Sequence, residues 1–82
     1  MALTDVKLPP LGENAGDEAR LSFWYVEAGE TVEKEDELVQ MITDKATFDV
    51  PSPVRGKVVE LVADEDAEVR VGEVLCRIET ED

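Results

Sequence analysis

The fold is decided by residues 38–50, which read Leu38-Val39-Gln40-Met41-Ile42-Thr43-Asp44-Lys45-Ala46-Thr47-Phe48-Asp49-Val50. Two runs of residues with high β-propensity flank the four residues at the centre of this stretch. Threonine and aspartate favour turns there, because their side chains hydrogen-bond to nearby backbone amides. The stretch therefore predicts a tight β-hairpin that carries Lys45 at its tip, in solvent and away from the core.

A lysine at such a tip stays protonated and hydrated, which makes it a poor general base or Schiff-base nucleophile. It is nevertheless accessible to an enzyme that modifies it, because position and access matter more than reactivity in that case. The geometry alone favours the plainer interpretation, in which Lys45 is an ordinary surface residue, one of four lysines in the chain.

Short runs rich in Val, Ile, Leu and aromatic residues continue along the chain, separated by glycine or proline roughly every 8 to 12 residues. This rhythm is typical of many short antiparallel strands. Val6 and Leu8 alternate with Lys7. In the same way, Val58, Glu60 and Val62 are expected to face one side of a strand, and Val59 and Leu61 the other. The best helical candidate, residues 32–38, is short and charged, so we interpret it as a turn that leads into a strand.

The chain also repeats itself when it is shifted by 37 residues without a gap. Similar residue types then coincide, as in Arg20 and Lys57, Leu21 and Val58, Trp24 and Leu61, Val32 and Val69, Asp36 and Glu73, Leu38 and Leu75, Val39 and Cys76, and Met41 and Ile78. Each half cannot bury its apolar face alone, so the two must pack face to face. The sequence predicts an all-β fold, a flattened β-barrel or sandwich of two small antiparallel sheets with internal pseudo-two-fold symmetry and with Lys45 in the link between the halves.

The length of 82 residues fits one domain, because domains run from about 50 to 250 residues. We expect a single domain over residues 1–79 and an acidic tail, or the start of a linker, over residues 80–82. No apolar run approaches the roughly 20 residues of a membrane-spanning helix. The N-terminus shows no basic region followed by an apolar stretch, as a secretory signal would have.

Charge is the most unusual feature of the composition, since 21 Asp and Glu against 8 Lys and Arg give a net charge of −13. Phosphate binding requires cationic contacts, so the balance argues against nucleic acids and anionic membrane surfaces as partners. Self-repulsion favours a soluble monomer. We therefore expect protein partners with basic surfaces.

Several kinds of site are excluded by residue type. The chain has no His and one Cys, so it holds no Ser-His-Asp triad, no imidazole base and no histidine or multi-cysteine metal site. Cys76 lies in an apolar run and is expected to be a buried small hydrophobe. A free cysteine suits a reducing compartment, so we expect the cytoplasm. Residues 64–66 are acidic but lack the loop pattern of a calcium site, so we expect no metal ligands there. With these kinds of site excluded, we expect no catalytic residues in the chain.

In order and spacing, five segments resemble the lipoyl domain of 2-oxo acid dehydrogenase acyltransferases. The resemblance spans about residues 6–79, and its segments are residues 8–13 (LPPLGE), 23–32 (FWYVEAGETV), 43–47 (TDKAT), 50–56 (VPSPVRG) and 71–75 (VGEVL). The segment 43–47 is similar to the family's lipoylation hairpin, and the segment 50–56 is similar to the proline-containing link that follows it.

The resemblance implies a carrier domain that is not catalytic by itself. Lipoic acid would be joined to Lys45 by an amide and would act as a swinging arm for acyl groups and electrons. The implied partners are a lipoate ligase or lipoyl transferase, a thiamine-diphosphate decarboxylase, an acyltransferase core that uses coenzyme A, and a flavin-linked dihydrolipoamide dehydrogenase. The resemblance also implies the mitochondrial matrix as the compartment if the chain is eukaryotic. By the same resemblance, Asp44 and Ala46 in the hairpin and Gly12 and Glu13 in an adjacent loop would contribute to recognition.

Two alternatives stay open beside this interpretation. A biotin carrier domain shares the fold and the presented lysine, but that family places methionines around the lysine, where this chain has Asp44 and Ala46. An unmodified acidic interaction module is the alternative from another class. The chain also departs from the family at Glu35, where glycine is common, so the turn there is expected to be less tight. Ala46 looks more like pyruvate-type than oxoglutarate-type relatives.

Overall fold

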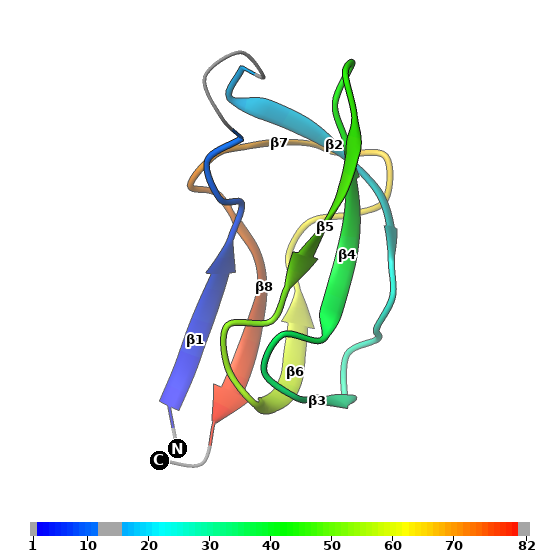
Figure 1. Ribbon diagram of the computed structural model, residues 1–82. Helices are drawn as coiled ribbons and strands as arrows, with labels where there is room; N and C mark the ends of the chain where they lie inside the picture. Colours follow the sequence, from blue (N-terminus) through cyan, green and yellow to red (C-terminus); the bar gives the residue numbers. More distant parts are fainter. Residues whose placement is uncertain (1, 12–15, 81–82) are drawn as a thin grey trace.

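The structure, a computed structural model, describes residues 2–11 and 16–80, which form eight β-strands in two antiparallel sheets (Figure 1). The strands are β1 (Ala2–Lys7), β2 (Glu18–Trp24), β3 (Thr31–Val32), β4 (Glu37–Ile42), β5 (Thr47–Pro51), β6 (Gly56–Leu61), β7 (Glu68–Arg70) and β8 (Val74–Thr80). One sheet, here called sheet A, has the order β1-β8-β6-β3, and the other, sheet B, has the order β5-β4-β2-β7. Within residues 2–11 and 16–80 there is no helix, and so none that could cross a membrane.

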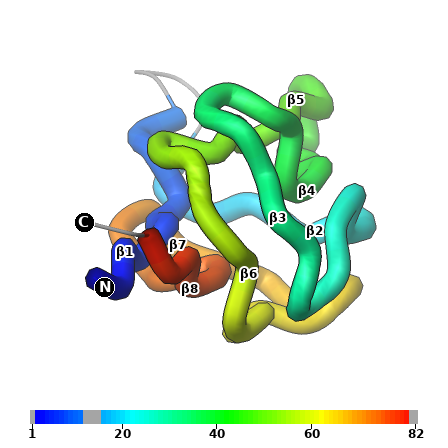
Figure 2. Tube along the Cα trace, turned by 90° about the horizontal axis from the view of Figure 1, so that it is seen from below, coloured from blue at the N-terminus to red at the C-terminus, as the bar shows by residue number. Residues whose placement is uncertain are grey.

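The two sheets pack face to face around a core to which both contribute, and Figure 2 shows the arrangement from below. The fully buried side chains are aliphatic for the most part and include Leu8, Leu21, Leu38, Val39, Met41, Val58, Leu75, Cys76 and Ile78. The predicted all-β sandwich is confirmed, with the sheets stacked as two layers that do not close into a continuous barrel. Val6 and Leu8 are buried and Lys7 is exposed, as their alternation predicted.

The predicted internal repeat is also present in the sheet topology. A shift of 37 residues carries β2 onto β6, β3 onto β7 and β4 onto β8. A shift of 44 residues carries β1 onto β5, because Val6 pairs with Cys76 as Val50 pairs with Val39. These equivalences convert the strand order of sheet A into that of sheet B, so the molecule has a pseudo-two-fold axis between its sheets.

Irregularities in the strands obey the same symmetry. The register of β2 against β4 shifts between Leu21 and Phe23, and that of β6 against β8 shifts between Val58 and Glu60. The simple alternation predicted for residues 58–62 is therefore wrong: Val58 is buried, but the extra residue at position 59 turns Glu60 and Val62 outward and leaves Leu61 against the core. A β-bulge inserts one residue and so reverses the alternation beyond it.

Residues 33–36 form the turn expected between two strands, with Asp36 N donating to Glu33 O at 3.1 Å. The expectation of a less tight turn at Glu35 is wrong. Glu35 adopts φ 75°, and the equivalent turn in the second half, at Gly72, has φ 91° and a matching hydrogen bond of 3.0 Å from Glu73 N to Arg70 O.

The two ends of the described chain lie side by side, because Ala2 pairs with Thr80 in sheet A (Figure 1). Strand β8 includes Thr80, which is buried and donates its hydroxyl to Ala2 O at 3.4 Å, so the strand runs one residue past the boundary expected at residue 79. Trp24 is half-buried against the core and donates its Nε1–H to Ala63 O at 3.0 Å, a packing role for this ring.

Candidate functional site

The predicted hairpin is formed by β4 and β5, which pair from Glu37 and Pro51 to Ile42 and Thr47. Its base is fixed in the core, because Leu38, Val39, Met41 and Val50 are buried there. Residues 43–46 connect the two strands, and three of them, Asp44 to Ala46, are exposed. The hairpin thus carries a solvent-exposed tip on a base that packing holds rigid.

The Thr43 hydroxyl organises the tip. Its Oγ1 accepts hydrogen bonds from the backbone N–H of Lys45 at 3.3 Å and of Ala46 at 3.1 Å, and it donates to Ala46 O at 3.1 Å. The backbone N–H of Thr43 also donates to Ala46 O at 2.8 Å. Asp44 and Lys45 keep negative φ, so this turn differs from the mirror-image turns common in two-residue hairpins, and the threonine side chain closes it.

Lys45 lies at the tip, at the end of the molecule opposite the chain termini (Figure 1). Because this hairpin joins β4 to β5, it is the link between the two pseudo-symmetric halves, as the repeat predicted. The equivalent end of the other half is formed by the start of β1 and the end of β8. The symmetric fold therefore has one such hairpin, and the place of its counterpart is taken by the chain ends.

The remaining lysines lie in other settings. Lys7 is at the end of β1 and Lys57 is within β6. Lys34 is exposed in the turn between β3 and β4, beside Arg55 and Lys57 at a depression of about 720 Å³. Lys34 is thus the closest geometric comparison for Lys45, but its turn follows a strand of only two residues.

Of the predicted recognition residues, Asp44 and Ala46 flank Lys45 and are exposed beside it. Gly12 and Glu13 lie outside the described residues. Sequence reasoning missed a depression of about 400 Å³ next to the hairpin, where Thr43 and Asp44 meet the ends of β2 and β7. It is lined by Glu18, Ala19, Arg20, Ile42, Thr43, Asp44 and Glu68. These residues are brought together by the pairing of β2 with β4 and β7, which no local motif encodes.

Two groups on the described part of the chain have pKa values that bear on the chemistry. Burial raises the pKa of the Cys76 thiol to about 11, so the thiol is inert at neutral pH, as the sequence predicted for a buried small residue. The hydrogen bond to Asp49 raises the pKa of the Tyr25 hydroxyl. In residues 2–11 and 16–80, no group of three or more His, Cys, Asp or Glu is placed to hold a metal ion.

Known proteins resemble this chain in sequence and in fold. Residues 4–78 match the Biotin_lipoyl family, described as biotin-requiring enzyme. The chain is 46% identical, over 94% of its length, to the dihydrolipoyllysine-residue acetyltransferase component of the pyruvate dehydrogenase complex of Corynebacterium glutamicum, and it covers 11% of that protein. It is 41% identical, over 99% of its length, to the lipoamide acyltransferase component of the branched-chain alpha-keto acid dehydrogenase complex of Bacillus subtilis, and it covers 19% of that protein.

Among solved structures, the chain is similar to the lipoyl domain of the 2-oxoglutarate dehydrogenase complex from Azotobacter vinelandii. The TM-score is 0.74 at 28% identity, and the match covers 95% of this chain and 98% of that domain. The chain therefore spans a small part of the curated relatives it matches but nearly the whole of a single solved domain.

Proposed function

The chain belongs to the biotin/lipoyl attachment family and is a lipoyl-type domain, and we propose that lipoate is attached through an amide to Nζ of Lys45. One observation carries the assignment to this lysine: Lys45 is exposed at the tip of the hairpin that joins the two halves, on strands whose bases are buried. The attaching enzyme needs access to the amine, and the Thr43 hydrogen bonds present the backbone at Lys45 and Ala46 in one conformation.

The residues at the tip suit a long covalent arm. Lys45 is exposed, and its neighbour Ala46 adds only a methyl group beside the point of attachment. The lipoyl group, when bound, supplies a dithiolane that takes up acyl groups together with two electrons and delivers them elsewhere. The amide removes the positive charge of Lys45, so the net charge changes from −13 to −14.

The function that follows is carriage rather than catalysis. The chain contributes a rigid base and a defined surface, while a tethered group reaches each active site at an effective concentration set by the linker. The chain termini lie opposite the hairpin, so further segments joined there would leave the tip unobstructed (Figure 1). We propose a place in an acyltransferase of a 2-oxo acid dehydrogenase complex, in a reducing compartment where the single Cys76 stays a thiol.

The proposed partners are a lipoate ligase or lipoyl transferase, a thiamine-diphosphate decarboxylase, the acyltransferase core and dihydrolipoamide dehydrogenase. At a net charge of −13, with Asp44 at the tip, the domain suits active sites with basic entrances. Complementary charge mainly accelerates encounter and rejects wrong partners, and salt weakens its effect. Among the 2-oxo acids, Ala46 and the 46% identity to the pyruvate-type relative favour a pyruvate-type complex.

The carrier proposal is tested with the lipoylated domain and three decarboxylases, which use pyruvate, a branched-chain 2-oxo acid or 2-oxoglutarate. We expect the pyruvate enzyme to acylate the domain fastest, and far faster than free lipoamide, which carries neither the tether nor the surface. Added salt should slow this reaction, and Asp44→Asn should slow it without unfolding the domain, because an exposed substitution costs under about 0.5 kcal/mol.

The matched control is Glu65→Gln, which removes one exposed carboxylate from the β6–β7 turn and should leave the rate unchanged. If free lipoamide reacts as fast as the domain, the domain surface has no part in recognition. Equal rates with all three decarboxylases would contradict the pyruvate assignment.

A further inference from the structure

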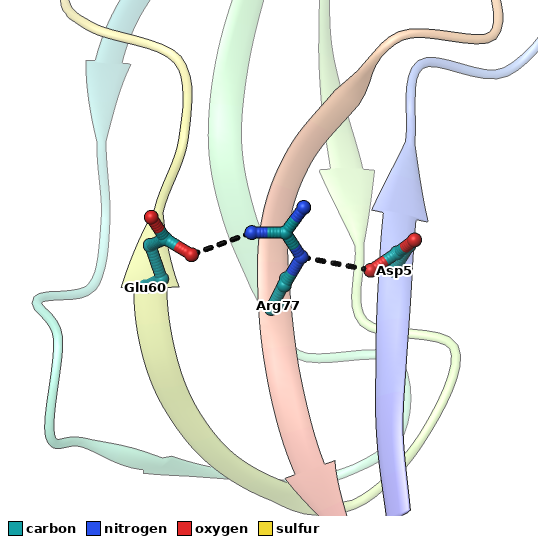
Figure 3. Close-up of polar contacts among 3 residues, drawn as sticks. All are labelled: Asp5, Glu60 and Arg77. Atoms are coloured by element: carbon teal, nitrogen blue, oxygen red, sulfur yellow. Dashed lines mark hydrogen bonds and ion pairs between the residues drawn. The ribbon is translucent and has the colours of Figure 1, made fainter.

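The outer face of sheet A carries a closed ion triplet at the centre of its three long strands. Arg77 on β8 lies between Asp5 on β1, at 3.1 Å, and Glu60 on β6, at 2.6 Å (Figure 3). The guanidinium of Arg77 donates a hydrogen bond to each of the two carboxylates. The bond to Glu60 is the larger cause, and the bond to Asp5 the next, of a raised pKa of Arg77. The triplet therefore pairs both carboxylates with an arginine of the same sheet.

The pseudo-two-fold axis places a different row at the same positions of sheet B. Shifts of 37 and 44 residues carry Gln40 onto Arg77, Phe23 onto Glu60 and Asp49 onto Asp5, and the strand register pairs Phe23 with Gln40 and Gln40 with Asp49. The row thus keeps one carboxylate, replaces the other by an aromatic ring, and has a neutral amide in place of the arginine.

An additional aromatic ring completes this row. The Tyr25 hydroxyl donates to Oδ1 of Asp49 at 2.8 Å, and its ring meets Phe23 edge to face with centroids 4.8 Å apart. Tyr25 is 41% exposed and Phe23 is 37% exposed, so both rings are accessible to solvent, including that of Tyr25, whose hydroxyl is bonded to Asp49. The residue equivalent to Tyr25 on sheet A is Val62, which has neither ring nor hydroxyl.

The row is continuous with the lipoylation hairpin. Gln40 and Asp49 belong to β4 and β5, the two strands that end in the tip. Two residues closer to the tip, Arg20, Ile42 and Thr47 form the next row on the same face of these strands. Arg20 and Ile42 in turn line the depression that reaches Asp44. A partner that receives the arm would therefore meet this face of sheet B.

We infer that Phe23, Tyr25 and Asp49 form a docking site for an arginine on the basic surface of the decarboxylase that reacts with the arm. This inference rests on the proposed function and names a partner contact for it. An arginine stacks on aromatic rings and pairs with carboxylates through a planar fork of donors, a combination that lysine lacks. Sheet A shows that a guanidinium fits the central position of such a row, and sheet B has Gln40 there.

The test exchanges the central residues of the two rows in the full chain. Gln40→Arg supplies sheet B with its own guanidinium beside Asp49 and Phe23, so the site is filled before the partner arrives. Arg77→Gln is the matched control, because it makes the reverse change at the equivalent position. After lipoylation is confirmed by mass, kcat/KM for reductive acylation is measured for each variant. The enzyme used is the one of the three decarboxylases above that acylates the native domain fastest.

We expect Gln40→Arg to lower kcat/KM at least fivefold and Arg77→Gln to change it less than twofold. Asp49→Asn and Phe23→Ala should each lower it about fivefold and reduce its salt dependence, while Val62→Ala leaves it unchanged. Tyr25→Phe keeps the ring and loses the Asp49 bond, so a decrease there cannot come from lost packing of the aromatic ring.

The inference is overturned if Gln40→Arg reacts like the native domain, or if Arg77→Gln slows the reaction as much. It is also overturned if the sheet B variants slow lipoylation alone, because the face would then belong to the attaching enzyme. Failure of the native domain to become lipoylated contradicts the proposed function instead, so the two failures are distinguishable.

Discussion

Glu35 and Gly72 occupy equivalent turns in the two halves of the molecule, and both have a left-handed backbone, with φ values of 75° and 91°. In each turn, the acidic residue after the left-handed position closes the loop through two hydrogen bonds. The backbone N–H of Asp36 donates to Glu33 O and its carboxylate accepts from Glu33 N, and Glu73 makes the same two bonds with Arg70. Glycine adopts this conformation freely, whereas a residue with a Cβ is strained there by about 1–2 kcal/mol. At this turn, the first half therefore holds backbone strain that the second half avoids by using glycine.

Replacing Glu35 by glycine should stabilise the domain by about 0.5–1 kcal/mol, because relief of the backbone strain exceeds the entropy that glycine loses on folding. The measurement is urea unfolding at constant salt. Asp66, which has φ 68° and is equivalent to Gly29, should gain less from the same change, since aspartate tolerates the left-handed region better than glutamate.

Both substitutions also remove a negative charge from a chain at −13, so Glu35→Gln is the control that removes the charge and keeps the Cβ. If Glu35→Gln stabilises as much as Glu35→Gly, the gain is electrostatic and the claim of backbone strain is wrong.

The buried thiol of Cys76 makes the stability depend on pH in the alkaline range. Burial raises its pKa from 9.0 to about 11, so the unfolded chain ionises first. The contribution of the neutral Cys76 thiol to the free energy of unfolding is fully present below about pH 9. This contribution, up to roughly 2–3 kcal/mol, is lost as the pH rises towards about 11. Urea unfolding from pH 8 to 11 checks this, with Cys76→Ala as the control that should flatten the slope. An equal slope in both proteins would assign the loss to other groups.

The Thr43 hydroxyl should control the order of the hairpin tip. In Thr43→Val, the N–H groups of Lys45 and Ala46 lose their acceptor. We expect faster hydrogen exchange at these two amides, a loss of about 1 kcal/mol of stability and slower lipoylation. Thr43→Ser retains the hydroxyl and should restore both exchange and lipoylation. Unchanged exchange in Thr43→Val would show that the backbone alone holds the tip.

Much of this architecture follows from local sequence. Two runs of residues with high β-propensity flank a Thr-Asp-Lys-Ala turn, so the hairpin and its exposed lysine could be predicted from residues 38–50. The repeat of 37 residues predicted that two equivalent halves pack face to face, because equivalent residues such as Leu38 and Leu75 face the same core. These features depend on local residue types and on an internal repeat, which a sequence displays directly.

The remaining features depend on contacts between distant segments. The bulge after Val58 is set by the register against β8, and simple alternation cannot show it. The left-handed backbone at Glu35 is imposed by its neighbours, since the residue itself disfavours that conformation. Likewise, the contact of Tyr25 with Asp49 joins residues 24 positions apart, and only the pairing of three strands brings them together.

The most direct test of the central claim is the intact mass of the chain after incubation with a lipoate ligase and lipoate. Three proteins are compared: the native chain, Lys45→Arg, and a variant in which Lys7, Lys34 and Lys57 are all arginine. We predict one lipoyl group on the native chain and on the triple variant, mapped to the peptide with Lys45, and none on Lys45→Arg. A lipoyl group on Lys45→Arg, or biotin attached by a biotin ligase where lipoate is refused, would contradict the account.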